Sequence, residues 1–119
     1  MDSRRVILHH LTTRTEWDAA LAGGCYSAPS LEAEGFIHLS TGEQVRLTAE
    51  RFYLEAPDLI VLDIDPRFCS GEIRWEEPAR DGDPGAGDLF PHLYGALETL
   101  AVLGTREVRF VDGRATLSP

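Results

Sequence analysis

Apolar residues, several of them branched, are concentrated near the start of the chain, in the segment 5–11 (RVILHHL). A short segment of this kind predicts a strand. Neighbouring side chains of a strand point to opposite faces, so His9 and His10 are expected to face opposite ways. At most one of these two histidines can therefore contribute to a given site.

The next segment carries the signals of a helix. Thr13 and Glu16 have the spacing of a capping box, apolar residues follow at helical spacing, and the pair Gly23–Gly24 ends the pattern. After a loop, residues 30–35 (SLEAEG) predict a single helical turn, which the serine caps and the glycine stops. We therefore expect one strand followed by two helical segments.

A second strand and a further helix follow. Residues 36–40 (FIHLS) alternate, which places the aromatic residue, the histidine and the serine on one face of a short strand. Thr41 and Gln44 have the spacing of another capping box. The apolar residues after them fall at helical spacing, and the helix is expected to end before Pro57.

The second half of the chain reads mostly as strands. Residues 59–65 (LIVLDID) predict a buried strand that leaves the core with its two aspartates facing solvent, and residues 72–76 (EIRWE) alternate like another strand. Residues 77–88 are rich in glycine, proline and charge and predict a polar loop. The pair Asp112–Gly113 is a strong hairpin signal.

This order of elements predicts a compact α+β fold with a mixed or antiparallel sheet. The 119 residues are expected to form one domain, residues 1–119. The chain has neither a Gly-x-Gly-x-x-Gly stretch after a strand nor a phosphate-binding Gly-Lys-Ser/Thr loop. These absences argue against a doubly wound nucleotide-binding fold.

Charge and composition narrow the possible partners. The net charge is −9, from 11 basic and 20 acidic residues, which argues against long nucleic acid as a partner while leaving room for a nucleotide in a local pocket. No apolar run is long enough for a signal peptide or for a membrane helix of about 18 residues, so we expect a cytoplasmic protein without a membrane partner. Cys25 and Cys69 are expected to be buried, reduced thiols.

Three histidines lie among large apolar residues: His10, His38 and His92, the last within residues 90–95 (FPHLYG). A buried imidazole needs a hydrogen-bond partner, so each could be a structural histidine that donates to a backbone carbonyl. Three such residues in one small domain favour a shared polar cavity instead. A three-histidine zinc site is a weaker alternative, because no short-range ligand pair is present, and we expect no metal.

Other polar residues compete for a role in such a cavity. Glu76 and Glu77 follow a tryptophan and are the best carboxylates for a general base or for a sugar-hydroxyl ligand. Tyr94 could stack on a planar ring or simply pack in the core. Ser40 could bind a ligand or cap the helix that follows it.

Two stretches of the sequence resemble the signature stretches of the bacterial domain-of-unknown-function family DUF952. They are GFIHLS, with the Gln-Val helix start that follows it, and FPHLYG. The histidine pair of the first strand, Trp17 and the pair Trp75–Glu76 fit the same family. The likeness extends from about residue 6 to residue 110.

The resemblance implies a fold similar to that of the ADP-ribosyltransferase-like group, which includes bacterial toxins, poly-ADP-ribose polymerases and RNA 2′-phosphotransferases. That fold is a small split β-core with two or three helices packed outside. Enzymes of this group hold NAD in a cleft between two sheets. The resemblance thus implies that the ligand is NAD, bound as a substrate, or a related nucleotide.

By position in the chain, the resemblance also implies site residues. His10 stands at the first-strand position, and His38 and Ser40 stand in the second motif, which lacks the tyrosine usual there. The expected site residues are the catalytic candidates His10, His38, Glu76 and His92 and the ligand-binding candidates Ser40 and Tyr94.

We therefore expect a cytoplasmic protein that binds NAD or a related nucleotide in a histidine-lined cleft, as an ADP-ribosyl or phosphoribosyl transferase. The alternative is a non-catalytic ligand-binding or interaction module with the same cleft. The net negative charge favours the alternative, since an anionic dinucleotide needs a local positive pocket.

Overall fold

The computed structural model describes residues 6–78 and 89–119, so most of the polar loop expected at residues 77–88 lies outside the described part. Three α-helices lie in the described part: α1 (Arg14–Gly23), α2 (Pro29–Glu34) and α3 (Val45–Phe52). Its strands are β1 (Leu8–Thr13), β2 (Cys25–Tyr26), β3 (Ile37–His38), β4 (Leu59–Ile64), β5 (Glu72–Glu76), β6 (Phe90–Tyr94), β7 (Leu97–Glu98), β8 (Val102–Val111) and β9 (Arg114–Leu117). Two short 3-10 helices are η1 (Pro66–Phe68) and η2 (Thr99–Ala101).

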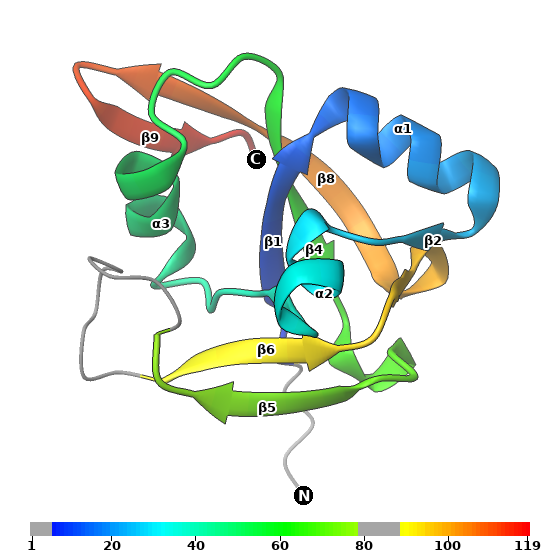
Figure 1. Cartoon of the computed structure of the whole chain (residues 1–119). Helices are drawn as coiled ribbons and strands as arrows, with labels where there is room; N and C mark the ends of the chain where they lie inside the picture. The colour runs from blue at the N-terminus through cyan, green and yellow to red at the C-terminus, as the bar shows by residue number, and fades with distance from the viewer. Residues whose placement is uncertain (1–5, 79–88) are drawn as a thin grey trace, which may run out of the picture.

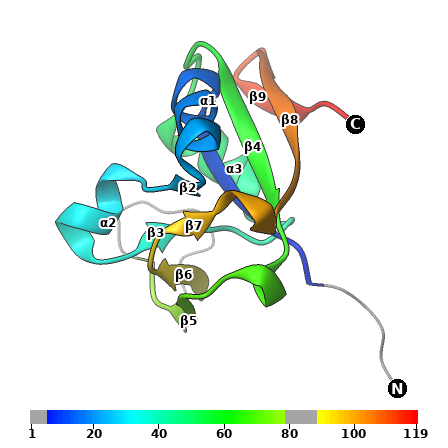
Figure 2. The same ribbon diagram turned by 90° about the vertical axis from the view of Figure 1, so that its right-hand side faces the viewer.

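The strands form three antiparallel sheets. Their orders are β1-β4-β8-β9, β3-β6-β5 and the two-stranded β2-β7. A single bridge between His9 and Ser40 joins the edge of β1 to the segment after β3. Figure 1 shows α3 on one side of β1 and α1 on the other, and Figure 2 gives the same arrangement from the side. The expected α+β class with helices outside antiparallel sheets is confirmed; among the described helices, none is long and apolar enough to span a membrane.

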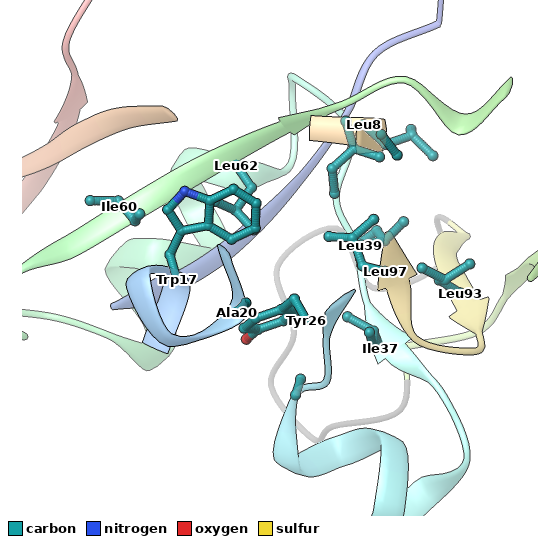
Figure 3. Close-up of a cluster of buried hydrophobic side chains, with 13 residues drawn as sticks. Leu8, Trp17, Ala20, Tyr26, Ile37, Leu39, Ile60, Leu62, Leu93 and Leu97 are labelled. Atoms are coloured by element: carbon teal, nitrogen blue, oxygen red, sulfur yellow. The ribbon is translucent and has the colours of Figure 1, made fainter. Parts of the chain in front are cut away.

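The hydrophobic core lies on both faces of β4. Ile60 and Leu62 belong to a cluster with Trp17 of α1, whose side chains Figure 3 shows. Leu59 and Val61 belong to a second cluster, which α3 covers. Burial on both faces explains why the sequence of β4 is continuously apolar rather than alternating. The buried strand expected over this segment is thus confirmed.

Local signals set the ends of α1. The Glu16 amide donates to Thr13 Oγ1 at 3.1 Å, and Gly24 adopts a left-handed conformation with φ 83° at the C-terminal end. The capping box before α3 is reciprocal, because Gln44 N donates to Thr41 Oγ1 and Thr41 N donates to Gln44 Oε1. The start of α1 expected from the sequence is therefore confirmed. The Thr41–Gln44 box closes a turn instead, because α3 itself begins at Val45, with Gln44 as its N-cap and no side-chain capping bond.

The N-terminal cap expected for α2 is wrong. The helix begins one residue earlier, at Pro29, with Ala28 as its N-cap and no side-chain capping bond. Proline suits the first helical position because it has no amide hydrogen to satisfy and its φ is already helical. Ser30 thus lies inside the helix, while Gly35, with φ 91°, ends it as expected.

Proline occupies a central strand in β6. Pro91 pairs with Trp75 of β5 on one side, and on the other its carbonyl accepts a hydrogen bond from Leu39 N at 3.0 Å. Leu39 stands opposite Pro91 in the β3–β6 register, where an antiparallel pair would exchange two hydrogen bonds. Pro91 cannot donate the second, which explains why β3 ends at His38.

Three expectations of exposure are wrong. Asp65 is 1% exposed and accepts hydrogen bonds from Arg67, and Asp63 is half-buried between His9 and Arg106. Cys25, expected to be buried, is exposed. Asp63 is covered by partners on β1 and β8 that lie far from it in sequence, and a local sequence pattern does not report such partners.

The C-terminal hairpin is confirmed. β8 and β9 pair antiparallel from Val108–Leu117 to Val111–Arg114. Asp112 and Gly113 form the turn with φ 52° and 79°. Two consecutive positive φ values are those of the type I′ turn that an Asp-Gly pair favours.

Candidate functional site

A cavity of about 460 Å³ lies along the edge of β1, and α2 and α3 contribute residues to its lining. A volume of this size is within the range of small-molecule sites, about 300–1,000 Å³. Its polar lining residues come from β1, α1, β2, α2, β3 and α3 and the segments next to them: His10, Thr12, Thr13, Glu16, Tyr26, Ser30, Glu34, His38, Ser40, Thr48 and Tyr53. Among the described residues, the lining contains two carboxylates and no arginine or lysine.

The edge of β1 presents backbone groups to this cavity. His9 and Ser40 exchange two backbone hydrogen bonds of 2.8 Å, so the N–H and C=O of His9 point away from β4. Backbone groups two residues apart in a strand point to the same side, so those of Leu11 also point away from β4. Leu11 lines the cavity, and β1 is the outermost strand of its sheet. The cavity therefore has a strand edge in its wall.

His10 is held by two neighbours at the base of the cavity. Its Nδ1 lies 2.6 Å from the His38 carbonyl oxygen, and its Nε2 lies 2.9 Å from the Tyr26 hydroxyl. A carbonyl oxygen only accepts, so Nδ1 carries a hydrogen. The ring orientation is thus fixed from both sides.

Tyr26 extends the contact from His10 to α1. Its hydroxyl lies 3.0 Å from Thr12 Oγ1, and Thr12 donates to Glu16 Oε1 at 3.0 Å. Burial raises the pKa of Tyr26 to about 12, so this hydroxyl keeps its proton at any working pH. That one proton can be donated to His10 or to Thr12, but not to both at once.

His38 and Glu34 form a second polar pair in the cavity. His38 Nε2 lies 2.8 Å from Glu34 Oε1, across one turn from α2 to β3. The side chain of His38 is 18% exposed and that of Glu34 is 39% exposed, so the pair is reached by solvent. Because the His38 carbonyl also holds His10, the short strand β3 positions two histidines through different atoms.

His92 belongs to a separate cluster on β5 and β6. His92 Nδ1 lies 2.8 Å from Glu76 Oε1, and the Tyr94 hydroxyl donates to the same oxygen at 2.7 Å. These two hydrogen bonds, Tyr94 first, hold the pKa of Glu76 below its usual value. Phe36 stacks on the His92 ring at 4.1 Å between centroids, and the His38 ring meets His92 edge-on at 5.5 Å.

The six expected site residues thus fall into two groups. His10, His38 and Ser40 line the cavity. The remaining three are Glu76, His92 and Tyr94, which lie in the β5–β6 cluster and are not among the lining residues. His38 stands between the groups. Of the two glutamates left open by the sequence, Glu76 turns to His92 and Glu77 is exposed.

Sequence reasoning missed several polar residues of the cavity. Tyr26 lies in a stretch whose sequence predicts a loop, and the position of Glu16 in a capping box already explains that residue. Thr12 could have been found, because the alternation that places His10 on one face of β1 places Thr12 on the same face. Thr48 lies on the apolar stripe of α3 and reads as core.

The described residues do not converge on a metal. No group of three or more His, Cys, Asp or Glu side chains within residues 6–78 and 89–119 is arranged to hold a metal ion. In the three-histidine zinc alternative, His10 would have no ring nitrogen left for the metal, because its Nδ1 faces a carbonyl and its Nε2 faces a hydroxyl. Cys69 is a poor nucleophile, because burial raises the pKa of its thiol to about 11.

Comparison with known proteins gives one family and one relative of known structure. The family model described as "Protein of unknown function (DUF952)" matches residues 11–105. The crystal structure of protein CC0527 from Caulobacter crescentus is similar, with a TM-score of 0.77, 31% identity and coverage of 92% of this chain and 93% of that chain. The solution NMR structure of CC0527 gives a TM-score of 0.73 at 29% identity, covering 92% and 90% of the two chains. No curated protein matches the chain.

Proposed function

The chain belongs to the family described as protein of unknown function (DUF952), and from its cavity we propose that it binds NAD or a related pyridine nucleotide. In this proposal the nicotinamide riboside end of the ligand occupies the cavity beside β1. The pyrophosphate and adenosine remain outside it. Binding of this ligand is the main proposal, and catalysis is a further step that depends on it.

The edge of β1 is the observation that carries the proposal. A carboxamide has one acceptor and two donor hydrogens, so it pairs with a backbone N–H and C=O in the way that a neighbouring strand does. Leu11 offers both groups on the side that faces the cavity. Nicotinamide carries such a carboxamide on a planar ring.

The charge of the lining supports the choice of the nicotinamide end. Glu16 and Glu34 line the cavity, and no arginine or lysine of the described ranges 6–78 and 89–119 lines it. The pyridinium ring of NAD is cationic and its ribose is neutral, so both suit an acidic cavity. A pyrophosphate would be repelled there, since it would meet carboxylates without a compensating cation.

The enzymatic form of the proposal is transfer of the ADP-ribosyl group of NAD to a nucleophilic acceptor, with water as the acceptor in hydrolysis. The bond between the ribose C1′ and the pyridinium nitrogen breaks, nicotinamide leaves as a neutral molecule with the bonding electrons, and the acceptor bonds to C1′ and releases a proton. The positive charge that develops on the sugar is stabilised by a nearby carboxylate. Glu16 and Glu34 are the carboxylates available in the cavity. His10 and His38 would orient the ligand beside them.

The second candidate is binding without turnover. One observation favours this candidate: both carboxylates already have hydrogen-bond partners in the protein. Glu16 accepts from Thr12 and Thr13, and Glu34 contacts His38. A carboxylate held in this way stabilises positive charge on a reacting sugar less strongly. The two candidates share the ligand and differ in whether nicotinamide is released.

A calorimetric titration tests the proposal. Nicotinamide riboside and NAD are expected to bind, while ADP-ribose, which lacks the ring and its carboxamide, is expected to bind at least about tenfold more weakly. Nicotinic acid riboside is the matched control ligand, since its carboxylate cannot donate to the Leu11 carbonyl and would face two glutamates. Release of nicotinamide from NAD, followed by chromatography, separates the enzyme from the binding module.

The proposal fails if ADP-ribose binds as tightly as NAD, because the protein would then recognise the ADP-ribose part of the ligand and not the nicotinamide. It also fails if none of the pyridine nucleosides binds. Binding of NAD with no nicotinamide released would retain the ligand and reject the transferase.

A further inference from the structure

The outer edge of β5 carries backbone groups that no described residue uses. β5 is the last strand of the sheet β3-β6-β5, and Figure 1 shows it at the lower side of the molecule with no labelled element beyond it. Pro91 of β6 accepts from Leu39 N on the β3 side, so the backbone groups of Pro91 and of Leu93, two residues on, face β3. The residues opposite these two on β5 are Trp75 and Ile73. Their N–H and C=O groups therefore point away from β6, toward the outer edge.

Another sheet edge of the same protein is covered by a side chain. In β9, the outer strand of the larger sheet, the Ala115 amide donates to Glu50 Oε2 of α3 at 2.7 Å. Proteins commonly cover a sheet edge in this way, because its unpaired backbone groups can pair with another chain. Within residues 6–78 and 89–119, no side chain makes such a contact with Ile73 or Trp75. The edge of β5 is thus open to a further strand.

The side chains of β5 carry alternating charges on one face. Glu72, Arg74 and Glu76 share this face, and Ile73 and Trp75 share the other. The side chains of Glu72 and Arg74 are 64% and 50% exposed and form an ion pair of 3.1 Å. A row of charges of one sign would repel a second copy of the strand. Alternating signs pair with themselves instead when the two copies are suitably shifted.

We propose that β5 pairs antiparallel with β5 of a second copy of this chain, about a twofold axis at Ile73. The pairing joins two three-stranded sheets into one. In this register Glu72 lies opposite the partner's Arg74, and the symmetry repeats this ion pair on the other side of the axis. These are non-hydrogen-bonded positions, where the side chains of an antiparallel pair approach most closely. Ile73 and the partner's Ile73 exchange their backbone hydrogen bonds.

The charges select this register over its two neighbours. Outward-facing residues pair with outward-facing residues, so the register changes in steps of two residues. An axis at Arg74 would set two arginines against each other and Glu72 against the partner's Glu76, which is repulsive at every charged position. An axis at Trp75 would place Arg74 opposite the partner's Glu76. That carboxylate already holds two side chains of β6.

Trp75 supplies an apolar contact in the proposed register. Its side chain is 46% exposed, and tryptophan is enriched at protein interfaces. It lies opposite the partner's Gly71, which has no side chain, and diagonal to the partner's Ile73. An aromatic ring reaches a diagonal neighbour on the next strand, so the indole can pack there. No residue of β5 is among the described residues that line the cavity, so the dimer does not depend on the proposed function.

Sedimentation equilibrium of the full chain tests the proposal. Between about 5 and 500 µM, as expected for a small interface, the parent should change from a monomer of 13.2 kDa to twice that mass. Glu72→Arg and Arg74→Glu each place like charges opposite one another twice. Each should therefore raise the dissociation constant at least about tenfold. An equimolar mixture of the two variants restores both ion pairs and should form a heterodimer.

The mixture and a matched variant serve as controls. Arg74 also lies over the Tyr94 ring at 4.4 Å, so its substitution could disturb β5 itself. Recovery of association in the mixture would show that both variants keep a competent strand. Arg109→Glu is the matched control, because Arg109 and Glu107 form a similar exposed ion pair, two residues apart on β8. It should leave the dissociation constant unchanged.

Three results would overturn the proposal. A parent that remains at 13.2 kDa at about 500 µM would leave the edge of β5 to a different partner or to none. If Glu72→Arg and Arg74→Glu dimerise as tightly as the parent, the dimer uses another surface. If each variant is a monomer and the mixture also stays monomeric, the two charges do not face each other across the interface.

Discussion

Tyr26 is the residue on which the geometry of the cavity depends most. Its hydroxyl meets His10 Nε2 and Thr12 Oγ1, and so it links the base of the cavity to the start of α1. The same side chain packs in the core cluster with Trp17, as Figure 3 shows. One residue thus joins the polar wall to the apolar interior.

Replacing Tyr26 by phenylalanine tests this role. The change keeps the ring and removes one hydrogen bond from His10 and one from Thr12, while the contacts of His10 with the His38 carbonyl and of Thr12 with Glu16 remain. We therefore expect a loss of about 1–3 kcal/mol in the free energy of unfolding, measured with urea. Tyr53→Phe is the matched control, because Tyr53 lines the same cavity and its hydroxyl makes no hydrogen bond to any described residue. It should change stability by less than about 0.5 kcal/mol. Equal effects of the two substitutions would show that the Tyr26 contacts are unimportant.

At the scale of elements, the three-stranded sheet depends on a close approach of two chain segments. A Cβ at Gly71 would lie 2.7 Å from the backbone oxygen of Tyr94 and 3.1 Å from Leu93 Cδ1. Backbone cannot yield as a flexible side chain does, so the residue before β5 must be glycine for β5 to lie against β6. This contact helps to set the position of Glu76 against His92 and Tyr94.

Gly71→Ala is therefore expected to destabilise the protein by about 1–3 kcal/mol. Gly104→Ala on β8 is the control, since a Cβ there meets nothing within 4 Å, and it should be close to neutral. Urea unfolding of both variants checks the difference. A neutral Gly71→Ala would mean that β5 can shift away from β6 at no cost.

Elements with strong local signals could be predicted from the sequence. The Thr13 cap, the capping box at Thr41 and Gln44 and the Asp112–Gly113 turn depend on residues within a few positions of one another. The two-residue strands β2, β3 and β7 could not all be predicted in this way, because pairing with distant segments defines them.

The candidate site was predictable only in part, for the same reason. The alternation in β1 places His10 on one face, but only tertiary packing brings Tyr26, Glu34 and Thr48 to the same cavity. Tertiary packing also places His92 in a different cluster from His10, although each is a histidine among apolar residues in the sequence. In the sequence, Ser30 has the features of a helix cap, because the proline before it is as typical of a loop as of the first position of a helix.

At the scale of the whole molecule, stability should depend on pH through His9. Burial lowers the pKa of His9 from 6.5, and this outweighs Asp63, which raises it; Arg106 lowers it further. The unfolded chain therefore takes up a proton at His9 before the folded protein does as the pH falls. The free energy of unfolding is then expected to decrease as the pH falls below about 6.5.

His9→Asn isolates this contribution, because asparagine can still donate to Asp63 and does not titrate. The slope of stability against pH between about pH 7 and pH 5 should be smaller in the variant than in the parent, as measured by urea unfolding at each pH. Glu76 and Glu98, whose pKa values are lowered from 4.5, change the free energy of unfolding only below about pH 4.5, outside this window. An equal slope in both proteins would contradict a depressed pKa for His9.

The most direct test of the central claim, that a ligand pairs with the edge of β1, is the same nicotinamide riboside titration followed by NMR at the Leu11 amide. Pairing with a carboxamide predicts that the Leu11 amide resonance shifts with ligand concentration and that its hydrogen exchanges more slowly in the complex. The Leu62 amide, on β4 and already within the sheet, should stay unchanged. A riboside that binds while leaving the Leu11 amide unaltered would contradict the account.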